Sequence, residues 1–148
     1  MTKYKVPDAL ASPTVESIEI ITEFRRMEMI AEAHAAANDL FARGGAIRDA
    51  EEALKPYRGQ LSIVAHVQFG LLTIGAPNVI IAVTGGPSPT PQAVDAKMKG
   101  IYVGDSLVGG DFEAIFRADS IGQTTRVVTV TSNGAQLQRV TVDFGALE

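Results

Sequence analysis

The pattern of apolar and polar residues changes period near the middle of the chain. From Leu61 onward, apolar residues occupy alternate positions, and Ser62, His66 and Gln68 are among the residues between them. A period of two is typical of strands, whereas the apolar residues before Pro56 follow helical spacing. This switch predicts an α+β domain, in which a helical half packs on a mostly antiparallel sheet.

The first half of the chain predicts two helices after an extended lead-in over residues 1–11. Ser12, followed by proline, is a typical helix start, so we expect a long helix over residues 13–43. A shorter helix is expected over residues 46–54. Together these elements make residues 12–55 the helical part of the domain.

The predicted long helix carries two apolar stripes. Phe24 and Met27 fall on one side of it, and Ile18 and Met29 fall roughly opposite. A surface helix needs only one apolar stripe, so two stripes indicate burial on both sides. We therefore expect a homo-oligomer formed through the long helix, with packing against the helix over residues 46–54 as the alternative.

The second half, residues 60–145, predicts a sheet of about six strands. The pair Asn133-Gly134 is the preferred sequence for a two-residue hairpin turn. A change of parity near Gln138 and Arg139 predicts a β-bulge. The expected strands cover residues 61–73, 78–84, 96–103, 112–118, 125–131 and 136–144.

Composition and charge narrow the classes of function. The 148 residues suit one domain, 1–148, and they include 13 basic and 17 acidic residues with no cysteine. A net charge of −4 without a basic cluster argues against binding to nucleic acid or an anionic membrane. The N-terminus has no apolar signal segment, and Gly75 and Pro77 interrupt the most apolar stretch, residues 71–83. A soluble, cytoplasmic protein is expected, although a virion component or a processed secreted protein has the same pattern.

His66 is the strongest candidate for chemistry, because it lies within a predicted strand on the polar face. An imidazole there suits a general base or a ligand contact. Gln68 shares that face, and Glu113 and Arg117 share one face of another predicted strand, so these four residues form the expected ligand site. No spacing of ligands predicts a metal, and no motif predicts a cofactor. The proline-rich loop over residues 85–91 is expected to be a rigid contact or rim element.

Three functions fit these patterns. The first is a non-catalytic, self-associating domain that binds a small apolar ligand or a protein partner. The second is a cofactor-free pocket enzyme, an isomerase, dehydratase or hydrolase, with His66 as its base. The third is a structural assembly protein of a virion or a secretion apparatus.

Overall fold

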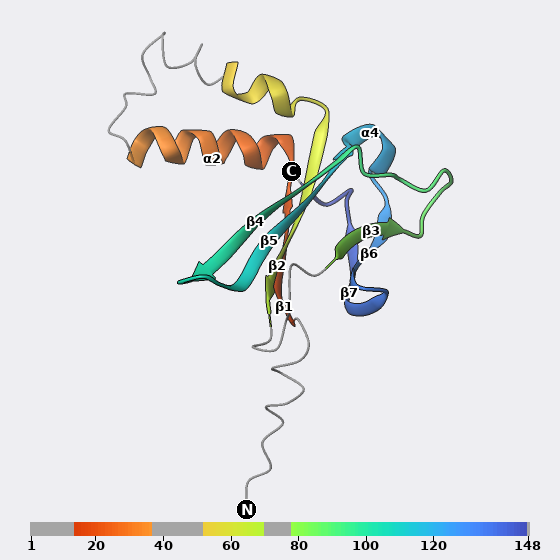
Figure 1. Cartoon of the computed structure of the whole chain (residues 1–148). Coiled ribbons are helices and arrows are strands. Elements are labelled where there is room, and N and C mark those ends of the chain that lie inside the picture. The colour runs from red at the N-terminus through yellow and green to blue at the C-terminus, as the bar shows by residue number, and fades with distance from the viewer. Residues whose placement is uncertain (1–13, 37–51, 70–77, 148) are drawn as a thin grey trace, which may run out of the picture.

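The structure, a computed structural model, describes residues 14–36, 52–69 and 78–147 (Figure 1). Within these ranges seven strands form two antiparallel sheets. The four-stranded sheet has the order β1-β2-β5-β4, and the three-stranded sheet has the order β3-β6-β7. The elements are β1 (Thr14–Ile21), α2 (Glu23–Ala36), η1 (Lys55–Tyr57), β2 (Gln60–Gln68), β3 (Val79–Thr84), β4 (Asp95–Val103), β5 (Ser106–Arg117), α4 (Ala118–Ile121), β6 (Thr125–Ser132) and β7 (Ala135–Asp143).

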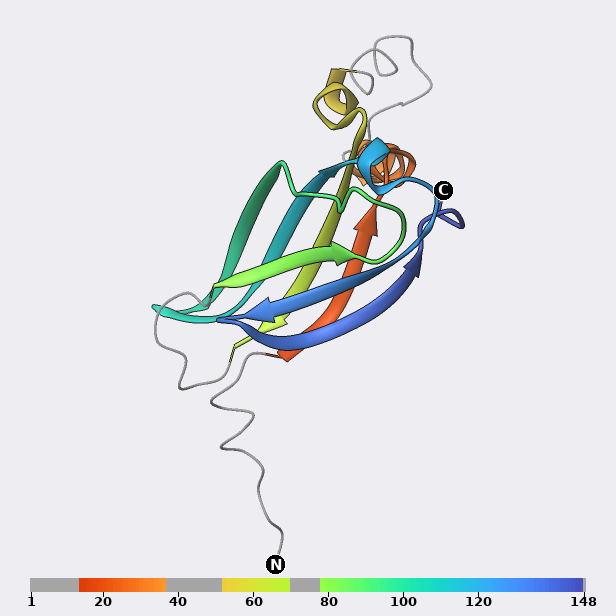
Figure 2. The ribbon, with the colours of Figure 1, turned by 90° about the vertical axis from the view of Figure 1, so that its right-hand side faces the viewer.

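The two sheets face each other, and their strands cross obliquely (Figure 2). The alternating apolar residues of β2, β3, β5 and β6 point between the sheets and form the core. On the outer face of the four-stranded sheet, polar residues such as His66 and Asp111 alternate with them, together with the buried Val64 and Ile115. The buried core residues are Leu61, Ile63, Ala65, Val67, Phe69, Ile81, Val83, Phe112, Ala114, Phe116, Ile121, Val128, Val130 and Phe144.

The predicted α+β class is wrong, because the start of the predicted long helix is the strand β1. This strand pairs antiparallel with β2, and its register shifts between Val15 and Ser17, so that Glu16 is an extra residue. The bulge lets Val15 and Ile18, three positions apart, both pack against the core. A spacing of three is typical of a helix, so the bulge made a strand resemble a helix in the sequence.

Helix α2 begins only after Thr22, whose side chain caps it. The Arg25 backbone N–H donates to Thr22 Oγ1 at 3.1 Å, and the acidic Glu23 follows in the first turn. The N-terminal cap predicted at Ser12 is therefore misplaced, because Ser12 precedes β1 along the chain. Residues 37–51 lie outside the described part, and with them the end of the predicted long helix and most of the predicted second helix. Residues 52–54 are helical and lead into η1.

All six predicted strands correspond to observed strands, with some changes in their bounds. The turn at Asn133-Gly134 is confirmed, since it joins β6 to β7 with φ values of 51° and 85°. The predicted bulge is present one residue early, because Gln136 and Gln138 pair with consecutive residues of β6 and Leu137 is left over. The end of the first predicted strand, residues 70–73, lies outside the described ranges.

In the described ranges no helix combines the length and the apolar character that crossing a membrane requires. Helix α2 extends from the end of β1 over the outer side of the four-stranded sheet (Figure 1). Two connections between the sheets lie within the described residues: residues 85–94, which follow β3, and the segment with α4, which follows β5.

Candidate functional site

A row of polar side chains crosses the outer face of the four-stranded sheet. The register places His66 of β2 between Ser17 of β1 and Asp111 of β5. Lys99 of β4 lies beyond Asp111. Because directly paired residues of neighbouring strands share a face, all four strands contribute to this row. Glu19 lies on the same face of β1, two positions from Ser17.

His66 has a carboxylate at each ring nitrogen. Its Nδ1 lies 2.6 Å from Asp111 Oδ1, and its Nε2 lies 3.5 Å from Glu19 Oε2. The hydrogen bond with Asp111 raises the pKa of His66 above its ordinary value. Partial burial acts in the opposite direction, while the charges of Asp111 and Glu19 add to the increase. A protonated His66 thus connects β1, β2 and β5 through one cation between two carboxylates.

This geometry suits a link between strands better than a general base. A general base needs an unprotonated nitrogen directed at the substrate, whereas Nε2 of His66 faces Glu19. Ser17 supplies a hydroxyl to the row, but the structure gives no hydrogen bond between it and His66. A concavity of about 320 Å³ is lined by His66 together with Glu16 and Ile101, among other residues. Within the described ranges, no three His, Asp or Glu side chains are placed to hold a metal ion.

The structure does not gather all the predicted site residues around His66. Gln68 is exposed and lies two positions along the same strand face. Arg117 lies at the far end of β5, where its Nη2 is 2.9 Å from Asp119 Oδ2. Both side chains of that ion pair are about two-thirds exposed, so Arg117 faces solvent rather than the histidine.

Glu113 fastens helix α2 to the outer face of the sheet. Arg26 of α2 places its Nη2 at 3.5 Å from Glu113 Oε2 and donates to Ser62 Oγ at 3.3 Å. The same guanidinium lies over the ring of Tyr57, 4.2 Å from its centroid. Glu113 therefore has a structural partner in Arg26, and its contact with a ligand stays a prediction.

The sequence patterns do not indicate the two carboxylates that flank His66. Asp111 precedes the strand predicted over residues 112–118, whereas β5 begins at Ser106. Glu19 falls within the helix predicted over residues 13–43, in which it has no fixed relation to His66. Alternation continued backward from Phe112 would have placed Asp111 on the polar face of the strand.

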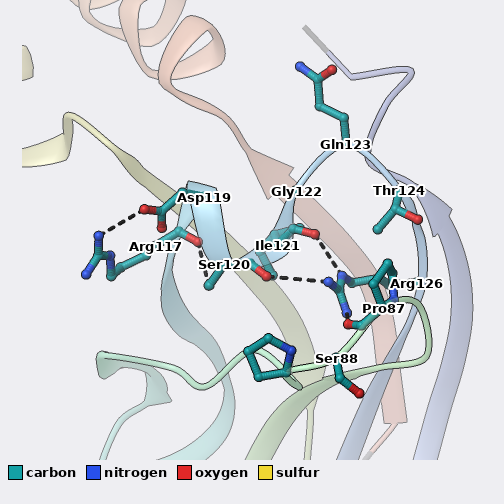
Figure 3. Close-up of a pocket in the computed structure, with 11 residues that line it drawn as sticks. Pro87, Ser88, Arg117, Asp119, Ser120, Ile121, Gly122, Gln123, Thr124 and Arg126 are labelled. Atoms are coloured by element: carbon teal, nitrogen blue, oxygen red, sulfur yellow. Dashed lines mark hydrogen bonds and ion pairs between the residues drawn. The ribbon is translucent and has the colours of Figure 1, made fainter.

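A second concavity, of about 610 Å³, surrounds the buried Arg126 of β6 (Figure 3). Arg126 is 4% exposed, and among the described residues its guanidinium donates hydrogen bonds only to backbone carbonyls. Its Nε donates to Ile121 O at 2.8 Å, and its Nη1 donates to Gly85 O at 2.7 Å. Longer contacts reach Pro87 O at 3.3 Å and Ser120 O at 3.5 Å.

Arg126 thus ties together two of the connections between the sheets. Gly85 and Pro87 belong to the loop after β3, and Ser120 and Ile121 belong to α4 after β5. The proline-rich loop predicted as a rim element does line this concavity, through Pro87, Ser88 and Pro89. Because its N–H groups are engaged by carbonyls, Arg126 acts here as a structural clasp.

A third concavity, of about 430 Å³, lies between β3 and β4, the edge strands at one side of the two sheets. Its lining is mostly apolar and includes Ile80, Met98 and Phe112, and Lys97 and Glu113 also line it. Ile80 and Met98 are exposed here because no other strand covers this side within the described residues.

The β4 strand is the most exposed element of the four-stranded sheet. Eight of its nine residues are exposed, and it is an edge strand whose one hydrogen-bonded neighbour among the described strands is β5. Met98, Ile101, Tyr102 and Val103 are 42% to 68% exposed. The hairpin that β4 forms with β5 projects from the body of the protein (Figure 1). Long edge strands with exposed apolar residues are typical sites of pairing with another chain.

The fold and these sites define a two-sheet antiparallel β protein with a polar link between strands, a buried arginine clasp and an open apolar edge. Comparisons with protein-family models, with curated proteins and with solved structures find no match to this chain. Its function is therefore inferred from its own residues.

Proposed function

We propose that this protein is a structural, self-associating protein whose copies join through the edges of the four-stranded sheet. The observation that carries the proposal is the exposure of β4, which combines unpaired backbone groups with apolar side chains. An exposed edge of this length, without cover, favours pairing with a further strand. This proposal keeps the self-association expected from the sequence and moves its interface from the helix to the sheet.

The polar row around His66 supports a structural role over a catalytic one. A histidine between two carboxylates connects three strands of the sheet that would carry the interface. Arg126 and Arg26 likewise make contacts that fasten loops and a helix to the sheets. In this proposal His66 and Glu113, two of the four predicted site residues, hold strands and a helix together.

The test is the mass of the protein in solution, measured by light scattering after size-exclusion chromatography over a range of concentrations. The wild type is expected to be an oligomer. Ile101→Asp combined with Val103→Asp is expected to yield monomers, because both residues are exposed on β4 and pairing with a further strand would bury a carboxylate without a partner. Exposed substitutions of this kind change the stability of a monomer by about 0.5 kcal/mol or less. A wild type that is monomeric at every concentration contradicts the proposal.

Phe24→Asp provides the matched control on helix α2. Phe24 is 54% exposed, comparable with the β4 residues, and it belonged to the helix stripe expected to form the oligomer. We expect this variant to keep the wild-type mass. If Phe24→Asp dissociates the oligomer while the β4 variant does not, the interface is helical and the sheet-edge assignment is wrong.

A second candidate function is the binding of a small apolar molecule in the concavity between β3 and β4. Its volume of about 430 Å³ and its apolar lining favour such a ligand. Native mass spectrometry of freshly purified protein tests this candidate, because a retained ligand adds mass to each chain. Met98→Lys should remove that added mass, and a wild type without added mass argues against this candidate.

A further inference from the structure

We infer that the copies pair head to tail, with β4 of one copy against β1 of the next, so that the four-stranded sheet continues from chain to chain. This inference rests on the proposed function and specifies its partner as a second copy of the same chain. It concerns the two edge strands of one sheet, and three independent features of these edges support it.

The first feature is the direction of the strands. All neighbours in the four-stranded sheet are antiparallel, so the first and last of its four strands, β1 and β4, run in opposite directions. A copy placed beside the sheet in the same orientation therefore presents its β1 antiparallel to β4. The three-stranded sheet lacks this property, because an odd number of antiparallel strands leaves its edges β3 and β7 running the same way.

The second feature is charge on the outer face of the sheet. Lys97 and Lys99 of β4 make no ion pair with any residue in the described ranges. The register places Lys97 in the row of Glu19 and Lys99 in the row of Ser17, next to the bulge at Glu16. Extending these rows into a second copy brings the two lysines of β4 opposite the acidic part of β1. Opposite charges facing each other across strands stabilise pairing.

The third feature is the apolar pattern on the inner face. Met98 lies in the same row as Ile18, through Ala65 and Phe112. In a continued sheet the exposed Met98 side chain comes to lie beside Ile18 of the second copy. The same register thus covers Met98 on the inner face and places Lys97 and Lys99 near acidic residues on the outer face. This agreement between the two faces of the sheet supports pairing of β4 with β1 of a second copy.

A two-fold pairing of β4 with β4 is the natural alternative, and charge disfavours it. Antiparallel pairing about the centre of β4 sets Lys99 against its own copy and brings Lys97 close to the same lysine. Like charges opposite each other destabilise a strand pair. Head-to-tail contacts are heterologous, so they generate a closed ring or an open filament according to the rotation between copies.

Charge reversal on each edge, followed by mixing, tests the inference. One chain carries Lys97→Glu with Lys99→Glu on β4, and a second carries Glu16→Lys with Glu19→Lys on β1. Each reversed chain alone is expected to lose the oligomeric mass of the wild type. An equimolar mixture is expected to regain it, with the two chains in a one-to-one ratio by native mass spectrometry, because each reversed edge then meets an edge of opposite charge.

The outcomes separate the inference from the proposed function. If the wild type is an oligomer but reversal on β1 leaves its mass unchanged, the sheet-edge function stands and the head-to-tail pairing is wrong. If reversal on β4 disrupts the oligomer and the mixture does not restore it, β1 is not the partner edge. A monomeric wild type overturns the proposed function itself. Should Glu19→Lys disturb His66 and unfold the chain, as far-ultraviolet circular dichroism would report, Glu16→Lys alone replaces it, because Glu16 makes no ion pair with any other described residue.

Discussion

The clasp at Arg126 makes a quantitative prediction about stability. Arg126→Met keeps the apolar volume of the side chain and removes the N–H groups that reach Ile121 O and Gly85 O at 2.8 Å and 2.7 Å. A hydrogen bond that involves a charged group contributes about 1.5–3 kcal/mol, so losing two short ones costs about 3–6 kcal/mol. Relief from burying a guanidinium offsets part of this loss. We therefore expect the free energy of unfolding to fall by about 2–4 kcal/mol.

Urea unfolding followed by circular dichroism measures this change, and Arg117→Met serves as the matched control. Arg117 borders the same concavity, but its ion pair with Asp119 is exposed to solvent. Exposed ion pairs contribute about 0–1 kcal/mol, so the control should be close to the wild type. Equal effects of the two substitutions would refute the reasoning, since burial and carbonyl contacts would then make no difference. Arg126→Lys should recover little, because an ammonium group cannot reproduce the fork of a guanidinium.

Three further predictions concern the sheets. Gly109→Ala should lower the free energy of unfolding by about 1–3 kcal/mol, because the new Cβ would lie 2.8 Å from the backbone oxygen of Val67. An unchanged midpoint of thermal unfolding would contradict this close packing of β2 against β5. The pKa of His66 is higher in the folded state than in the unfolded state, so protonated His66 stabilises the fold. This stabilisation is complete at a pH below the pKa of His66 in the unfolded state, and it is lost as the pH rises through the pKa in the folded state. His66→Gln should therefore be less stable than the wild type by about 1–2 kcal/mol near pH 6, with a smaller difference at pH 8 in urea titrations; a difference that grows with pH contradicts this sign. Phe116→Ala should lower the free energy of unfolding by about 3–5 kcal/mol, because Phe116 is 1% exposed. The exposed Phe24→Ala should change the urea midpoint little. Equal losses of stability in the two variants would disprove the assigned core.

Local signals in the sequence predicted the hairpin half of the fold well. The turn at Asn133-Gly134 depends on two residues that tolerate positive φ, so neighbours in the chain determine it. The bulge at Leu137 leaves a parity change that can be read from the strand itself. Where the interactions are between neighbours in sequence, composition and period were sufficient.

The first strand could not be predicted in the same way, because its bulge changed the spacing of its apolar residues. An extra residue at Glu16 turns the spacing of two between core positions into a spacing of three, which helices also produce. Only pairing with β2 resolves the ambiguity, and that pairing is far away in sequence. The content of β-branched residues in β1, including Val15 and Ile18, was the local signal that favoured a strand.

The candidate site shows the same division between local and distant information. Alternation placed His66 correctly on the polar face of its strand. The partners Asp111 and Glu19 come from strands 45 residues later and 47 residues earlier in the chain, so no spacing relates them to His66. The register of three strands brings these groups together, and register depends on the packing of the whole sandwich.

The lysines of β4 have a second interpretation, which bears on the proposed assembly. Natural proteins often place lysine on an edge strand to prevent pairing with other strands. These lysines repel edges that carry positive charge, above all the β4 edge of a second copy. They do not repel β1, whose outer face carries Glu16 and Glu19. Lys97 and Lys99 therefore select among partners: they disfavour two-fold pairing of β4 and leave the acidic edge of another copy as the favoured neighbour.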